Sequence, residues 1–359
     1  MTTESPALAH ALVAWSCGHL SSVDSSYHIT ALEARSKALL ELSKAVSSPD
    51  ETLRESNAAA SLVLMTSEVC LGDHTKWLNH LGGIKHIILS ARRRNISGGH
   101  LLHGPEALKQ SPEGRWILRN FAYHDILGSV TLGHPPLINA CYLKGITDEV
   151  DTYLGLASEV LILVSEISCL DVLRLANSYV LMNEADPPNT QKSFQVMERA
   201  LRTWTCHKDG SLTLTALAYT YRGAGLLYLY RQTLRGMRLL PYSSTVDQHR
   251  DFHRLLHSRI QTEVASTLQF VTRVPLSGFP EAALLFPLFL IGGEAMDPLH
   301  IDLVRTRLQL MLEKRHFHNI LRALEVLEDV WKRRQYHQET YDIDWQDAID
   351  NNGGELLLT

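Results

Sequence analysis

Residues 77–88 read WLNHLGGIKHII, and the spacing of the side chains in this stretch decides the fold class. One stripe recurs every three or four positions and comprises Trp77, His80, Leu81, Ile84, Ile87 and Ile88. This spacing is the period of an α-helix with one buried face. A second stripe is formed by Val150, Tyr153, Ala157, Val160, Val164 and Ile167, and a third by Ile320, Leu324, Leu327, Val330 and Trp331.

The same periodicity predicts further helices over 8–20, 31–46, 116–132, 212–234, 252–271 and 301–312. Helix-breaking and helix-capping residues separate them at Ser48-Pro49-Asp50, Gly72-Asp73, Asp186-Pro187-Pro188-Asn189 and Asp297-Pro298. Segment 90–114, which carries Arg92-Arg93-Arg94, reads as a loop, and 271–276 is the nearest approach to a strand. We therefore predict an all-α fold, an array of roughly a dozen antiparallel-packed helices in a single domain over 1–359.

Composition excludes several classes of protein. Apolar residues make up 45% of the 359 residues, which is enough for a large core, and the net charge of −5 gives no overall attraction to nucleic acid. The five cysteines are scattered, so no cysteine-rich zinc site is predicted. The longest apolar run, 282–293, is shorter than the about 20 residues of a membrane span. We expect a soluble, intracellular protein without membrane contact, metal or cofactor.

Two sets of residues are candidates for a site. Trp77 and His80 share one helical face and form the wall of a ligand pocket or, as we favour, part of the core. Glu68 lies on the face of Leu64 and Met65, where a buried carboxylate is either a general base or, as we favour, one partner of an ion pair between helices.

Tyr123, His124 and Asp125 are consecutive and so point in three directions around a helix, which prevents a triad among them. His124 and Phe121, one turn apart, are further ligand candidates. If the chain is an enzyme, its catalytic candidates are Glu68, His80, Tyr123, His124 and Asp125; helix packing is the interpretation we favour.

Other patterns favour structure over chemistry. His249, His253 and His257 lie on one predicted helical face, but no HExxH motif accompanies them, so we favour a solvated face over a zinc site. Arg92-Arg93-Arg94 and Lys332-Arg333-Arg334 are interpreted as basic residues at helix ends. Gly223 and Gly225 lie in an apolar helical run and predict close helix packing.

Several strings, in order along the chain, resemble the second type of fungal-specific transcription factor domain. They are Glu68-Val69-Cys70-Leu71-Gly72-Asp73 with Trp77, His80-Leu81 and Gly83; Phe121-Ala122-Tyr123-His124-Asp125 with Ser129, Thr131, Gly133 and Pro135-Pro136-Leu137; Glu281-Ala282-Ala283-Leu284-Leu285-Phe286-Pro287-Leu288-Phe289 with Gly293-Glu294-Ala295; and Ala323-Leu324-Glu325-Val326-Leu327 with Trp331, Trp345 and Leu356-Leu357-Leu358-Thr359. Ile84 stands where the family usually has alanine.

The resemblance implies a regulator of transcription, of metabolic or secondary-metabolite genes, located in the nucleus and acting through partner proteins, a homodimer or a small-molecule effector. The family's six-cysteine zinc cluster is absent from this sequence, so we expect no specific DNA binding by this chain alone. Two alternatives remain open. The chain is a co-regulator that pairs with a complete factor, or an enzyme of fungal natural-product biosynthesis on the same scaffold.

Overall fold

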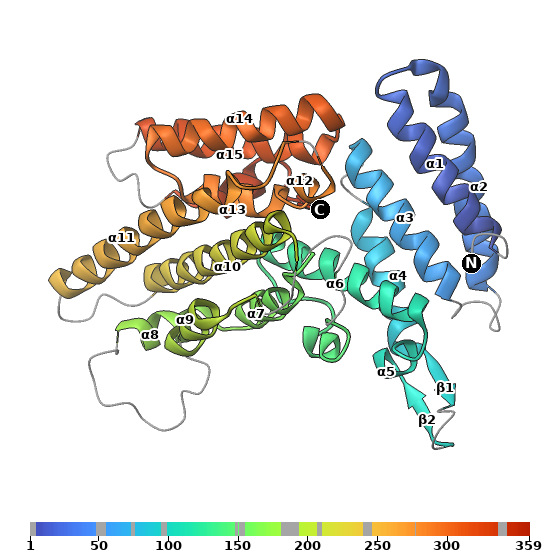
Figure 1. The fold of residues 1–359 in the computed structure, drawn as a ribbon, viewed down its shortest axis with the longest axis horizontal. Coiled ribbons are helices and arrows are strands. Elements are labelled where there is room, and N and C mark those ends of the chain that lie inside the picture. Colours follow the sequence, from blue (N-terminus) through green and yellow to red (C-terminus); the bar gives the residue numbers. More distant parts are fainter. Residues whose placement is uncertain are drawn as a thin grey trace.

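Helices dominate the computed structural model, which confirms the prediction of an all-α fold (Figure 1). The structure describes residues 5–47, 55–72, 76–94, 99–147, 150, 155–180, 194–206, 210–239, 246–276, 278–336 and 343–359. Two of the predicted breaks, at Ser48-Pro49-Asp50 and at Asp186-Pro187-Pro188-Asn189, lie outside these residues, as does Asp73.

The first half of the chain contains α1 (Pro6–Ser21), η1 (Ser25–Tyr27), α2 (His28–Ser47), α3 (Glu55–Leu71), α4 (Trp77–Ser90), β1 (Arg92–Arg94), β2 (Leu101–His103), α5 (Pro105–Leu108), α6 (Pro112–Leu132), η2 (Ala140–Leu143) and α7 (Ser158–Ser168). The chain continues with α8 (Val172–Val180), α9 (Phe194–Thr203), α10 (Leu212–Leu239), α11 (Val246–Val271), α12 (Phe279–Ala282), α13 (Leu285–Glu294), α14 (Pro298–Arg315), α15 (His318–Tyr336) and α16 (Trp345–Asn351).

The termini of these helices follow the expected chemistry. Asp297 is the N-cap of α14, where its carboxylate accepts the amide of Leu299 at 2.8 Å and Pro298 occupies the first turn. Gly72 follows α3 with a φ of 99°, a left-handed conformation that favours glycine because it has no Cβ. The predicted end of α3 and start of α14 are therefore confirmed.

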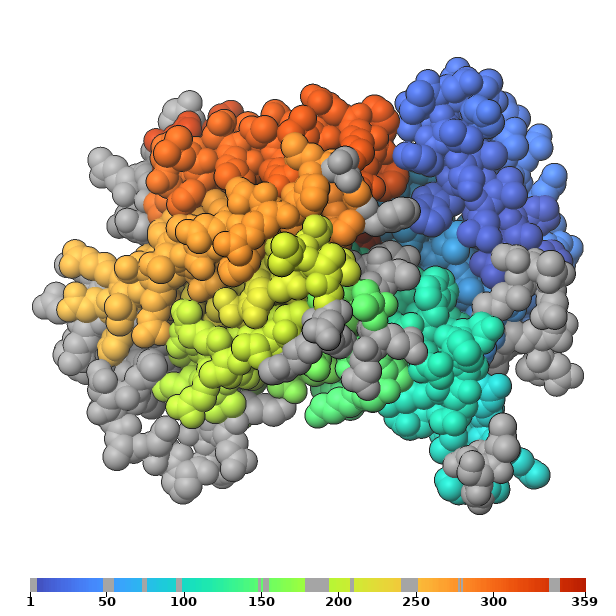
Figure 2. Space-filling view, in the orientation of Figure 1, coloured from blue at the N-terminus to red at the C-terminus, as the bar shows by residue number. Residues whose placement is uncertain are grey.

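Two layers meet along α3. The α1–α2 hairpin packs on one side of α3 and forms a small core with it, and Figure 1 shows this hairpin at the edge of the molecule. The opposite side of α3 faces the main core, which extends from Ala58 to Leu358. Because both sides are covered, every residue of α3 over 57–70 is buried. The space-filling view shows the N-terminal hairpin against the C-terminal helices (Figure 2).

The main core is built around α10. This helix contacts α7, α8, α9, α11 and α13, and its buried residues extend from Ala216 to Met237. Gly223 makes one of these contacts close, since a Cβ there would lie 2.0 Å from Oγ1 of Thr267 on α11. The glycines of this run therefore permit close helix packing, as the sequence predicted.

The segment expected to be a loop contains a small hairpin instead. β1 pairs antiparallel with β2, with Arg93 opposite Leu102, and α5 follows. The prediction missed β1 because its three side chains are all exposed, so no alternation of apolar and polar residues marks it. The arginines expected at the end of a helix, Arg92, Arg93 and Arg94, are in fact the residues of this strand.

One other expectation is corrected. The stripe that begins at Val150 was predicted as one helix, but α7 begins only at Ser158, after Gly155 adopts a φ of 57°; Tyr153 lies outside the described residues. Residues 272–276, which follow α11, form no strand, in agreement with the sequence analysis. Among the described helices, none combines the length and the apolar character needed to cross a membrane.

Candidate functional site

Glu68 joins three helices. Its carboxylate, on α3, accepts Nη2 of Arg35 from α2 at 2.6 Å and lies 3.2 Å from Nε2 of His80 on α4. The Glu68 side chain is 3% exposed, so the two cationic or protonatable partners replace water around it. This is the arrangement expected of a structural ion pair.

The charge state of Glu68 follows from these contacts. Burial raises the pKa of the carboxyl group, but the hydrogen bond and charge of His80, together with those of Arg35, outweigh burial. The pKa therefore lies below its ordinary value, and Glu68 is an anion at neutral pH. A carboxylate with a lowered pKa that is held by two partners is a poor general base.

Trp77 packs in the main core. It is 1% exposed, and its indole packs on Gly128 of α6, where a Cβ would lie 2.9 Å from the ring. Trp77 and His80 thus occupy one helix but contact different neighbours, α6 and α3 respectively. A role for either in ligand binding stays a prediction.

The candidates on α6 are all buried. Asp125 accepts the backbone amides of Leu137 at 2.8 Å and Ile138 at 3.0 Å, and so anchors the turn that follows α6. Burial raises the pKa of Asp125 to about 6, against the effect of these amides. The carboxyl group of Asp125 holds backbone and is not presented to a ligand in the described structure.

Phe121, Tyr123 and His124 pack within the same core. The rings of Tyr123 and His124 meet edge to face, with centroids 5.3 Å apart. His124 is 0% exposed, and this burial lowers its pKa to about 3, so the imidazole is neutral at physiological pH. The structure brings Glu68 and His80 together, and Tyr123 and His124 together, but Asp125 contacts backbone instead.

The histidine row on α11 lines a pocket with a histidine from α14. His253 and His257 have ring centroids 4.6 Å apart, and His300 lies across from them. We call this cavity of about 710 Å³ the histidine pocket; its lining residues are His253, Arg254, His257, Ser258, Gln261, Met296, Asp297 and His300. The side chain of His249 is outside the described part of the chain. Within the described ranges, no three His, Cys, Asp or Glu side chains are arranged to hold a metal ion.

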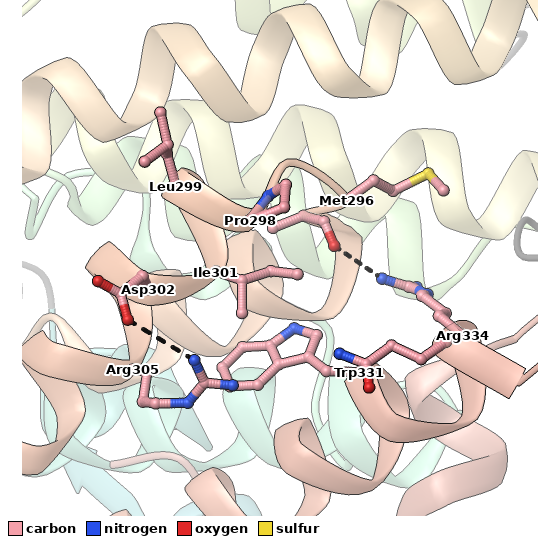
Figure 3. Close-up of a pocket in the computed structure, with 10 residues that line it drawn as sticks. Met296, Pro298, Leu299, Ile301, Asp302, Arg305, Trp331 and Arg334 are labelled. Carbon is pink, nitrogen blue, oxygen red and sulfur yellow. Dashed lines mark hydrogen bonds and ion pairs between the residues drawn. The ribbon is translucent and has the colours of Figure 1, made fainter.

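Met296 also lines a second pocket, which Figure 3 shows. We call this cavity of about 520 Å³ the Trp331 pocket; it is lined by Ala295, Met296, Pro298, Leu299, Ile301, Asp302, Arg305, Trp331, Arg334 and Gln335. Figure 3 shows Ile301 above the indole of Trp331, with Arg305 on one side and Arg334 on the other. The lining residues come from the α13–α14 junction, α14 and α15.

Local hydrogen bonds fix the position of Trp331. Its Nε1 donates to the carbonyl of Gly292 at 2.9 Å, near the end of α13. The guanidinium of Arg305 lies 4.8 Å from the centre of its ring, and Arg305 also forms a two-point ion pair with Glu328. The two side chains that meet at the floor of the pocket are therefore held in place without a ligand.

Arg334 is buried beside this pocket at 8% exposure. Its guanidinium donates to the carbonyls of Gly293 and Ala295, at the end of α13, and to that of Ile343. Burial lowers the pKa of Arg334 to about 10, a value at which the group is still charged at neutral pH. The sequence predicted a basic run at a helix end; it did not predict that Arg334 turns inward. A signal was available, since Arg334 lies three residues after Trp331, on the same helical face.

The comparisons with known proteins give one match. The model of the fungal specific transcription factor domain matches residues 1–359. No curated protein and no solved structure matches the chain. Because the family model covers the sequence from end to end, and the helical structure agrees with the fold that the resemblance implied, the chain belongs to the fungal-specific transcription factor domain family.

Proposed function

We propose that this chain regulates the transcription of a metabolic or secondary-metabolite gene set, through contacts of its helical surface with partner proteins or with a small ligand. The observation that carries this proposal is the family match over residues 1–359. A net charge of −5 favours contacts with proteins or small molecules over contacts with the phosphate backbone. Its place of action would be the nucleus.

The contacts of the candidate catalytic groups support a regulator over an enzyme. The carboxylate of Glu68 is engaged by Arg35 and His80, and that of Asp125 by two backbone amides. An acid–base catalyst needs a group that reaches the substrate and whose protonation can change during the reaction. In the described structure these two carboxylates instead hold helices and a turn together.

The test is deletion of the gene in the source organism, followed by transcript and metabolite profiles. A regulator is expected to change the transcript levels of a defined gene set, and the wild-type gene should restore them. Accumulation of one pathway intermediate with all transcripts unchanged would contradict the proposal and indicate an enzyme. A Glu68→Gln gene provides the control: once protein levels are matched, it should restore transcription if Glu68 is structural, whereas an enzyme using Glu68 would stay inactive.

A further inference from the structure

The Trp331 pocket has the size and lining of a small-molecule site. Its volume of about 520 Å³ lies within the range of ligand pockets, about 300–1,000 Å³. Six of its ten lining residues are apolar, and they are Ala295, Met296, Pro298, Leu299, Ile301 and Trp331. Such a lining favours a ligand with an apolar body, because each apolar group that it covers leaves water.

Among the residues that the structure describes, Arg334 supplies a positive charge with no carboxylate in contact. Its hydrogen bonds go to three neutral carbonyl oxygens, and among the described residues its Nε has no hydrogen-bond partner and the guanidinium forms no ion pair. The other arginines of the region differ. Arg231 is paired with Glu294, and Arg305 with Glu328. The charges of Glu294 and Asp344 attract Arg334, but burial outweighs them and lowers its pKa to about 10, so an anion in direct contact with the guanidinium would be stabilised.

The charge of Arg334 also acts on the neighbouring histidine pocket. His257 is 7% exposed, and its pKa is lowered to about 3, first by burial and then by the charges of His253, Arg231 and Arg334. Burial disfavours charge of either sign, whereas the repulsion by the neighbouring cations acts only against added positive charge and is the smaller effect. Asp302 also lines the Trp331 pocket, and its negative charge would repel a ligand that carries several negative charges. A ligand with a single negative charge therefore fits this pocket better.

We propose that the Trp331 pocket binds a small amphipathic organic acid, with its apolar body between Met296, Ile301 and Trp331 and its single carboxylate directed toward Arg334 (Figure 3). The inference deepens the proposed function, and only its regulatory consequence rests on that function. Because the α13–α14 junction, α14 and α15 all contribute to the pocket, the acid would bridge that junction to the two helices.

Binding is tested with the purified chain by calorimetric titration and thermal unfolding. The probes are octanoate and naphthalene-2-acetate, each compared with its neutral amide. We expect saturable binding of at least one acid and a higher melting temperature of the protein in the presence of that acid. The matching amide should bind with a dissociation constant at least about tenfold larger. No saturable binding of either acid, or equal binding of acid and amide, would overturn the inference.

Two variants on α14 locate the site. Ile301→Trp places a large ring in the pocket and should abolish acid binding, whereas Leu310→Trp, at an exposed position of the same helix outside the pocket, should leave it unchanged. Undiminished binding by a folded Ile301→Trp protein would contradict the proposed location. Arg334→Gln should remove the preference for the acid over the amide. Because Arg334 also holds the end of α13, this variant can fail to fold, and the Ile301→Trp result then tests the location of the site.

The outcome is separable from that of the proposed function. If acid binding fails while deletion still changes a defined gene set, only the ligand inference is wrong. If the acid binds and no transcript changes, the regulatory role is wrong and the pocket stands.

Discussion

Arg231 and Glu294 form a two-point ion pair inside the main core. Nε of Arg231 donates to Oε1 of Glu294 at 2.7 Å, and Nη2 donates to Oε2 at 2.5 Å, with both side chains 2% exposed. Nε1 of Trp345 donates to the same Oε1 at 3.1 Å. One carboxylate therefore links α10, α13 and α16, three helices that are distant in sequence.

The first prediction concerns this pair. Glu294→Gln leaves the guanidinium of Arg231 buried beside a neutral group, so we expect the free energy of unfolding to fall by about 3–5 kcal/mol. Glu328→Gln, which breaks the pair with Arg305 at 30% and 45% exposure, should cost less than about 1 kcal/mol. Urea denaturation measures both. If both variants lost the same free energy of unfolding, the buried pair would be no more important to stability than the exposed pair, and the prediction would be wrong.

The second prediction concerns the close contact of α10 with α11. In Gly223→Ala the new Cβ would overlap the side chain of Thr267, which is itself buried, so we expect a loss of about 1–3 kcal/mol. Gly83→Ala, within α4, meets no atom within 4 Å and should stabilise the protein by about 0.5–1 kcal/mol through its helix propensity. If Gly223→Ala and Gly83→Ala changed the melting temperature in the same direction, the close contact of Gly223 with Thr267 would be contradicted.

The third prediction concerns pH. His124 is neutral in the folded protein because burial lowers its pKa to about 3, while in the unfolded chain its pKa is near 6.5. Below about pH 6.5 the unfolded state therefore binds a proton that the folded state does not, and stability falls as the pH decreases. Between about pH 7.5 and about pH 5.5, His124 alone should cost about 1.4 kcal/mol.

Comparison with His124→Leu isolates this effect. Asp125 acts in the opposite sense, since its raised pKa of about 6 makes the folded state bind the extra proton as the pH falls through that value. Asp125 is present in both proteins, so its contribution largely cancels. Urea denaturation at the two pH values should show a loss about 1.4 kcal/mol smaller in His124→Leu. An identical pH dependence would mean that His124 is not neutral in the folded state.

The fourth prediction concerns DNA. The chain has a net charge of −5 and no six-cysteine cluster, so the purified chain alone should give no sequence-selective shift of DNA in a gel assay. Any weak binding should disappear as salt increases, because it would rest on phosphate contacts. A selective complex that persists at high salt would show that the chain reads bases directly.

Much of the fold could be predicted from local pattern. The stripe from Trp77 to Ile88 predicted α4, and Asp297-Pro298 predicted the start of α14, because helical period and capping depend on residues a few positions apart. The short strand β1 and the late start of α7 could not be predicted in the same way. The first has no apolar alternation, and the second depends on the backbone conformation of Gly155.

The sequence by itself determined the helical class, the family and the ion pair of Glu68, but it predicted a solvated face for the histidines of α11, where His257 is in fact buried. Only the tertiary structure decided the partners: Arg35 for Glu68, Glu294 for Arg231, and the carbonyls of α13 for Arg334. The physical reason is that helix formation depends on neighbours within about one turn, whereas burial of a charge and its compensation depend on contacts between helices. Arg334 illustrates the difference. The neighbouring residues predict that Arg334 lies in a helix, but its inward position beside Trp331 depends on where α13 ends.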